Sequence, residues 1–261
     1  MVNLGLAGAM RQKGKQLRPL LCGYYGEHNI GDDALLAVLL SQVPPGSDPL
    51  VTARDEPWVV ERFGVGTCDR RRLGEVLRAL WFRDVLVLGG GSLLQDATSL
   101  KSLLYYCLLM VAARLQGKSV LLWGQGLGPL RRPVSRVLVR LVLPLATVVS
   151  WRDEDSGAAA RRLGRRQQSV GSDPVWAYPI QEPWRGKGGP IVLCWRPVRE
   201  LDTNGWLPYL KALATLVADS QREVIWLPFH QGQYRGLLQL LLQAERRTRR
   251  GAARGREGPV A

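Results

Sequence analysis

The sequence predicts an α/β protein in which short apolar strands alternate with helices. Three observations support this class. Apolar runs such as Leu20-Leu21-Cys22 lead directly into turns rich in glycine or polar residues, a helical segment follows each turn, and the strand segments are apolar on both faces. Strands of that kind are typical of a parallel sheet covered by helices on both sides. We therefore expect a Rossmann-like parallel sheet domain followed by a second, incomplete α/β domain.

The elements follow one another in a regular order. The predicted strands of the first domain are 20–22, 49–53, 84–88, 119–123 and 148–150. The predicted helices are 32–41, 55–63, 70–82, 100–116, 133–143 and 156–163. The helix over 70–82 has its leucines and valine on a single face, which indicates packing against the sheet. Because the carboxyl ends of parallel strands meet at one edge, the turns that follow them should line one cleft.

Changes in composition predict the domain boundaries. We expect an N-terminal Rossmann-like domain over 17–177 and a linker over 178–190, where proline and glycine accumulate. A strand–helix–strand pattern predicts a partial C-terminal domain over 191–236. The final segment, 237–261, has no periodicity and is rich in arginine, and we expect it to be a basic, disordered tail.

Charge and cysteine content restrict the class of protein. The net charge is +14, which suits anionic ligands, nucleic acid or the acidic inner face of a membrane. Zinc-finger spacing and aromatic RNA-binding motifs are missing from the sequence, so we expect no nucleic-acid partner, no metal and no cofactor. The four cysteines form no CxxC pair and predict a cytoplasmic protein with reduced thiols. Peripheral contact with an anionic membrane stays open.

The turn from Gly23 to Asp32 is the first candidate for a binding site. A glycine-rich turn from strand to helix presents free N–H groups at the positive end of the helix dipole, which suits a phosphate or a carboxylate. One such turn can simply connect a strand to a helix. Similar turns follow the strands over 84–88, 119–123 and 148–150, and this recurrence predicts an anion-binding cleft.

The motifs in these turns resemble those of a known family. The series GYYGEHNIGDDALL, GGGSLLQD, GQGLGPL, SWRDEDS and SDPV resembles the polysaccharide pyruvyltransferase family, particularly its bacterial cell-wall type, over roughly residues 20–176. The resemblance implies a two-domain architecture similar to that of the glycosyltransferase-B fold. It also implies transfer of a pyruvyl group from phosphoenolpyruvate to a sugar of a cell-surface polysaccharide or lipid-linked glycan. The products are a cyclic ketal and phosphate.

The resemblance and the charges of phosphoenolpyruvate select candidate site residues. The predicted substrate-binding residues are Gly26, Asn29, Gly31, Asp32, Gly90, Gly91, Ser92, Gln125, Gly126 and Arg152, with Gln95 as a further contact to a hydroxyl. Arg152 is the expected anion-binding fork. The catalytic groups are unassigned beyond Asp32 and His28, since ketal formation needs an acid or a base nearby.

Each candidate has a structural alternative. Arg152 can instead pair with Asp155 at the surface, Asp32 and Ser92 can serve only as helix caps, and His28 can be a solvated loop residue. The four arginines Arg161, Arg162, Arg165 and Arg166 form either a solvated helix face or a contact with a membrane surface.

The second half departs from the family pattern. Members carry an Arg-Leu-His motif there, which this sequence lacks. His230 is followed by Tyr234 where members usually show an aspartate. We therefore expect little or no activity from a chain with an incomplete second domain. The alternatives are a nucleotide-sugar glycosyltransferase of similar architecture and a non-catalytic protein that binds anions or membrane surfaces.

Overall fold

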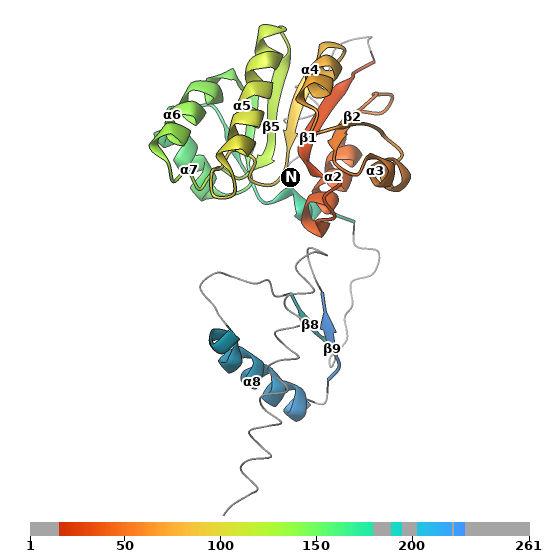
Figure 1. The fold of residues 1–261 in the computed structure, drawn as a ribbon, viewed down its shortest axis with the longest axis vertical. Coiled ribbons are helices and arrows are strands. Elements are labelled where there is room, and N and C mark those ends of the chain that lie inside the picture. Colours follow the sequence, from red (N-terminus) through yellow and green to blue (C-terminus); the bar gives the residue numbers. More distant parts are fainter. Residues whose placement is uncertain (1–15, 180–188, 195–202, 221, 228–261) are drawn as a thin grey trace, which may run out of the picture. The chain divides into compact units, whose positions relative to one another are not determined.

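The computed structural model describes residues 16–179, 189–194, 203–220 and 222–227 (Figure 1). The chain divides into two compact units, residues 1–179 and 180–261, and each is described by itself. The predicted linker, the segment around His230 and the predicted tail over 237–261 fall outside the described residues, apart from the ends of the linker.

The first unit is built on a seven-stranded parallel sheet, which confirms the predicted α/β class. Along the sheet the strands run in the order β3-β2-β1-β4-β5-β6-β7. Their bounds are β1 Pro19–Tyr25, β2 Leu50–Ala53, β3 Gly66–Asp69, β4 Val85–Gly89, β5 Ser119–Gln125, β6 Val148–Trp151 and β7 Ser169–Val170. The central strand β4 is buried along its whole length, as expected of a strand with helices on both sides.

Helices cover both faces of this sheet (Figure 1). Their bounds are α2 Ile30–Gln42, α3 Glu56–Phe63, α4 Leu73–Trp81, α5 Leu100–Leu115, α6 Pro133–Val142 and α7 Glu154–Arg162, with 3₁₀ turns η1 Leu143–Leu145 and η2 Pro174–Ala177. Helices α4 to α7 contribute to one buried cluster, whereas α2 and α3 contribute to the other. The layers are therefore helix, sheet and helix.

Polar side chains fix where several helices begin. Asn29, Asp55, Ser99 and Asp153 are the N-caps of α2, α3, α5 and α7, and each accepts a hydrogen bond from a backbone N–H of the first turn. Such caps satisfy donors that have no partner within the helix. Helix α3 ends at Gly64, whose φ of 64° is left-handed, a conformation that glycine adopts without strain.

Two strands were missed by the sequence prediction. β3 has the sequence Gly-Thr-Cys-Asp and β7 has two residues, so neither shows the apolar run that marked the other strands. β3 also corrects the predicted start of the helix over 70–82. The Arg70 N–H donates to the Ala53 carbonyl at 2.9 Å, so α4 begins only at Leu73.

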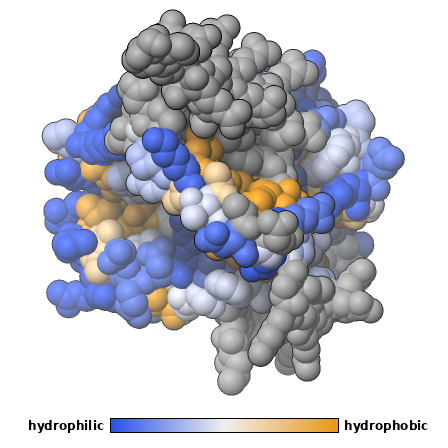
Figure 2. Space-filling model, turned by 90° about the horizontal axis from the view of Figure 1, so that it is seen from below, coloured by the Kyte–Doolittle hydropathy of each residue, from blue (hydrophilic) through white to orange (hydrophobic). Residues whose placement is uncertain are grey.

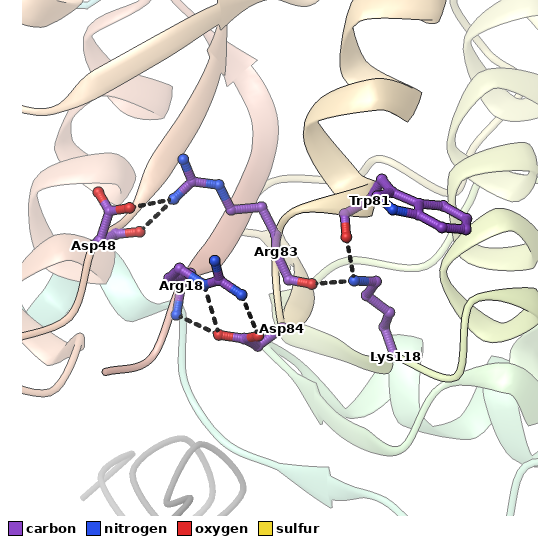
Figure 3. A network of polar contacts seen from close by, with 6 residues as sticks. All are labelled: Arg18, Asp48, Trp81, Arg83, Asp84 and Lys118. Carbon is purple, nitrogen blue, oxygen red and sulfur yellow. Dashed lines mark hydrogen bonds and ion pairs between the residues drawn. The ribbon is translucent and has the colours of Figure 1, made fainter. Parts of the chain in front are cut away.

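Ion pairs and carbonyl contacts tie together the amino ends of the central strands (Figure 3). The guanidinium of Arg18 donates to both carboxylate oxygens of Asp84, at 3.3 and 3.2 Å. Arg83 donates to the carboxylate of Asp48 at 2.9 Å. Lys118 donates to the carbonyls of Trp81, at 2.7 Å, and Arg83. These contacts therefore link the residues that precede β1, β2, β4 and β5.

The described part of the second unit is a strand–helix–strand element, as predicted. Strands β8 (Ile191–Leu193) and β9 (Val224–Trp226) pair in parallel, and helix α8 (Thr203–Ser220) connects them in sequence. Among the helices of the described residues, none combines the length and apolar character that crossing a bilayer requires.

Candidate active site

The candidate site lies at the carboxyl ends of β1 and β4, where the sheet order reverses direction. From β1 the chain continues to β2 on one side, and from β4 it continues to β5 on the other. The connecting helices α2 and α5 pack on opposite faces of the sheet. In doubly wound sheets ligands bind in the crevice that such a reversal opens. The turns 26–31 and 90–99 directly follow β1 and β4 at this reversal.

The turn after β1 is held in a tight and specific shape. Gly26 has a φ of +68°, and a Cβ there would lie 2.8 Å from the Asp55 backbone nitrogen. His28 also has a positive φ, 56°, and its Nε2 lies 3.1 Å from an Asp55 carboxylate oxygen. Asn29 accepts a hydrogen bond from the Gly31 N–H at 3.0 Å. In this structure His28 and Asn29 shape the turn.

The glycines after β4 allow this turn to pack against α2. A Cβ at Gly89 would lie 2.4 Å from Leu39 Cδ2, and one at Gly90 would lie 2.8 Å from Leu35 Cδ1. Gly90 and Gly91 also have φ values of +72° and +67°, where other residues are strained. Any larger residue at these positions would separate the turn from the helix.

Gln125, at the end of β5, hydrogen-bonds to the same turn through its side-chain amide. Its side chain is fully buried. The Nε2 group donates to the carbonyls of Leu88 at 3.1 Å and Gly90 at 2.8 Å, and Oε1 accepts from the Leu93 N–H at 3.4 Å. The amide is thus engaged by backbone groups on both sides of the glycine run. In this position Gln125 holds the turn.

Arg152 joins the turn after β4 to the loop before η2. Its Nη2 donates to Ser92 Oγ at 3.2 Å, and its Nη1 donates to the Asp173 carboxylate at 3.3 Å. Its Nε lies 3.5 Å from the carboxylate of Asp153. These contacts replace the pair with Asp155 that the sequence left open. The absence of a side chain at Gly126 makes room for Ser92 and Arg152. A Cβ there would lie 2.3 Å from Ser92 Oγ and 3.0 Å from Arg152 Nε.

Asp32 is an acidic residue in the first turn of α2, next to the glycine turn after β4. One carboxylate oxygen lies 3.4 Å from the position that a Cβ would take at Gly91. Burial raises the pKa of Asp32 to about 7, and the charges of Asp33 and Glu27 add to this rise, whereas Arg70 and Arg152 oppose it. This pKa lies far above the ordinary value of an aspartate, and the main cause is the loss of hydration around the charged form.

Sequence reasoning missed Glu27 and Arg70. The carboxylate of Glu27 accepts from Arg70 at 2.6 Å and from Arg54 at 2.8 Å, and its side chain is only 8% exposed. Arg70 also donates to the Tyr106 hydroxyl at 3.2 Å and lies 4.6 Å from the centre of the Tyr24 ring. Arg70 directly follows β3, so recognising this polar strand would have placed an arginine at the cleft edge.

Gln95 has local partners. Its side chain accepts from the N–H groups of Ala97 and Thr98 and donates to the Thr98 hydroxyl at 2.6 Å. The neighbouring Asp96 is buried and accepts the N–H groups of Arg131 and Arg132, both at 2.8 Å. These contacts lower the pKa of Asp96 to about 2, mainly through the Arg131 N–H. Asp96 thus joins the turn after β4 to the one after β5, whereas Gln95 bonds within its own turn.

The structure thus brings most of the sequence-predicted residues to one edge of the sheet. The backbone lies close to neighbouring groups at four of them, Gly26, Gly90, Gly91 and Gly126. Arg152 lies beside Ser92, and its charge acts on Asp32. A sequence model of the family described as polysaccharide pyruvyl transferase matches residues 29–248 of the chain. The chain belongs to the polysaccharide pyruvyl transferase family. The matched range includes all four turns that the motifs marked, apart from the first residues of the β1–α2 turn.

Comparison of this family member with solved structures gives distant likenesses. A candidate UDP-N-acetylglucosamine 2-epimerase from Listeria monocytogenes is 12% identical with a TM-score of 0.46, over 81% of this chain and 62% of that chain. The UDP-GlcNAc 2-epimerase from Neisseria meningitidis, bound to UDP-GlcNAc, is 13% identical with a TM-score of 0.48, over 87% of this chain and 70% of that chain. The chain therefore spans less than two thirds of the Listeria protein. Among curated proteins, none matches this sequence.

Proposed function

We propose that the protein transfers a pyruvyl group from phosphoenolpyruvate to two hydroxyls of a sugar in a polysaccharide or a lipid-linked glycan. Membership of the polysaccharide pyruvyl transferase family supports the reaction class. Among individual residues, the proposal rests on Asp32. Burial raises the pKa of this carboxyl to about 7, and the charges of two arginines, Arg70 and Arg152, act on it. A trianionic donor needs cations, and its double bond needs a proton.

In this proposal the donor lies between Arg152 and the N-terminus of α2. Arg152 is one-third exposed and keeps donor capacity for a phosphate or carboxylate, and the first turn of α2 adds N–H groups and its dipole. The charge of Arg70, which follows β3, also acts on Asp32. Placing an anion next to Asp32 raises the pKa of that carboxyl further, which favours its protonated form in the complex.

The reaction needs one proton to move to carbon. Protonation of the methylene carbon of phosphoenolpyruvate makes the adjacent carbon electrophilic, and the two sugar hydroxyls then form two C–O bonds while the bond to phosphate breaks. Of the two hydroxyl protons, one replaces the proton delivered to the methyl group and the other leaves with phosphate. Asp32 is the proposed group that delivers and recovers that proton.

The test uses the full chain, phosphoenolpyruvate and cell-wall glycan fragments, with released phosphate and ketal formation as readouts. We expect Asp32→Asn to keep phosphoenolpyruvate binding and to lose turnover by 10²–10⁴-fold, the range of a lost acid–base catalyst. Asp155→Asn is the matched control, because Asp155 is an exposed carboxylate in the first turn of α7.

The outcomes separate the candidate functions. Unchanged turnover in Asp32→Asn would remove Asp32 from the mechanism. Binding of a UDP-sugar that phosphoenolpyruvate does not displace would support the glycosyltransferase alternative. A wild-type chain that binds phosphoenolpyruvate and releases no phosphate would match the inactivity expected from the unusual second half of the sequence.

A further inference from the structure

Helices α5 and α6 present apolar side chains to solvent along their outer faces. On α5 the exposed residues are Leu104, Leu108 and Leu115, the last at 83%. On α6 they are Val134, Val137 and Leu141, the last at 68%. Within each helix the spacing of three, four or seven residues puts these side chains on one stripe. The two helices pack against each other, so the stripes belong to one surface, which we call the α5–α6 face.

The charged residues of the α5–α6 face all have one sign. From Ala97 to Arg152 the sequence contains no aspartate or glutamate. The exposed cations of the two helices and of the turn before α6 are Lys101, Arg114, Arg131, Arg132, Arg136 and Arg140. The carboxylate of Asp96, which lies nearest in sequence, is buried against the backbone of that turn. Apolar stripes and unopposed cations therefore occur together.

An apolar hollow adjoins this face. It has a volume of about 420 Å³ and lies between the turn after β5 and helix α7. Leucines, a proline and an alanine form most of its wall, and Arg136 and Arg162 contribute the cations. Figure 2 shows apolar surface bordered by strongly polar surface over the side of the first unit where α6 and α7 lie. Apolar side chains with arginines beside them therefore also line this hollow.

We infer that the α5–α6 face docks the protein on an anionic lipid bilayer. A surface helix with apolar side chains on one stripe and Lys and Arg beside it is the type of element that lies in a membrane interface. The apolar stripe enters the headgroup region, and the cations meet the negative surface potential. Neither contribution suffices alone for firm attachment, and here both occur on the same two helices.

Charge argues against the other occupants of this face. A second copy placed symmetrically on it would bring the cations of both copies together with no carboxylate between them, which is repulsive. Nucleic acid would satisfy the cations but would leave the Leu and Val stripes without an apolar partner. An anionic bilayer satisfies the cations and the stripes together. The inference does not depend on pyruvyl transfer.

Co-sedimentation of the full chain with phosphatidylcholine vesicles, with and without 30% phosphatidylglycerol, tests the inference. We expect binding to the anionic vesicles and little to the neutral ones. Arg132→Gln/Arg140→Gln should weaken the partition coefficient by about 30-fold, because each cation near an anionic surface contributes about fivefold. At low salt, where the electrostatic attraction is strong, Val137→Ser/Leu141→Ser should still weaken binding, because it removes an apolar contribution that salt does not screen.

The matched control is Arg62→Gln/Arg71→Gln, which removes the same two charges from exposed positions outside the α5–α6 face. It should retain most of the wild-type partition. An equal loss in this control would overturn the inference, because net charge alone would then explain binding. Binding that requires RNA or disappears with nuclease would overturn it in favour of nucleic acid.

Oligomeric state and folding complete the test. A wild-type dimer that Val137→Ser/Leu141→Ser converts to a monomer, without vesicle binding by either form, would assign the face to a second copy. All three double variants should show wild-type circular dichroism. If the α6 variant fails to fold, Leu104→Ser/Leu108→Ser on α5 provides the same comparison. Phosphoenolpyruvate binding should be unchanged in every variant, so failure of the docking proposal and failure of the proposed reaction are distinguishable.

Discussion

Replacing Asp32 with asparagine should stabilise the protein while removing the proposed proton-transfer group. Burial of the carboxyl raises its pKa from 3.8 to about 7, so the folded state binds the proton more tightly than the unfolded state does. That difference corresponds to a penalty of about 4 kcal/mol for the ionised form, at 1.36 kcal/mol for each pKa unit. The penalty is present in full above pH 7 and shrinks as the pH falls toward 4.

The sign of the pH dependence follows from this linkage. Between pH 4 and 7 the folded state holds more protons than the unfolded state, so stability decreases as the pH rises through this range. From pH 5 to pH 8 the Asp32 carboxyl should reduce the free energy of unfolding by about 2–3 kcal/mol. Asp32→Asn has no such group and should gain the most over wild type at pH 8.

Urea denaturation at pH 5, 6, 7 and 8 measures this effect. We expect the difference between Asp32→Asn and wild type to grow with pH and to reach about 2–4 kcal/mol at pH 8. Asp155→Asn should instead lose about 0.3–1 kcal/mol at every pH, because an exposed acid in a first helical turn interacts favourably with the helix dipole. A constant difference from pH 5 to 8, or an Asp32→Asn variant less stable than wild type at pH 8, would refute the reasoning.

Three further substitutions probe the cleft. Arg152→Gln should weaken phosphoenolpyruvate binding about 10- to 100-fold, since a hydrogen bond to a charged group contributes about 1.5–3 kcal/mol. Isothermal titration calorimetry measures this affinity. An unchanged affinity would place the donor elsewhere. Gly126→Ala should weaken the same binding and reduce stability by about 1–3 kcal/mol, because the new Cβ overlaps Ser92 Oγ; a wild-type melting curve would contradict this. Tyr25→Phe removes a buried hydrogen bond to the Gly89 carbonyl at 2.6 Å and should cost about 1–3 kcal/mol in urea denaturation, with activity reduced in proportion to folded protein.

The sequence predicted the central sheet well because its inner strands are marked by composition. β4 is apolar and buried at every position, and the glycines after it have positive φ angles that favour glycine. The edge strand β3 could not be predicted in the same way. Its polar residues are half-buried at the edge of the sheet, so its pairing with β2 is decided by tertiary structure rather than by local pattern.

The roles of individual site residues were harder to predict than their location. Gln125 and Ser92 lie in motifs that end at the same cleft, but only the structure separates a buried amide that holds backbone groups from a hydroxyl beside Arg152. The sequence also gave no means of pairing Glu27 with Arg70, which are 43 positions apart. Strand order determines such contacts, and strand order depends on the whole chain.

The support that Gln125 gives to the glycine turn has a consequence for how the cleft responds to acidity. A primary amide neither gains nor loses a proton in the physiological range, and its three partners are backbone groups. The floor of the cleft therefore keeps its shape when Asp32 changes its protonation. A change in turnover between pH 6 and 8 would then come from groups that titrate in this range, such as Asp32 and the phosphate of the proposed donor, and not from a loss of the contacts that Gln125 makes.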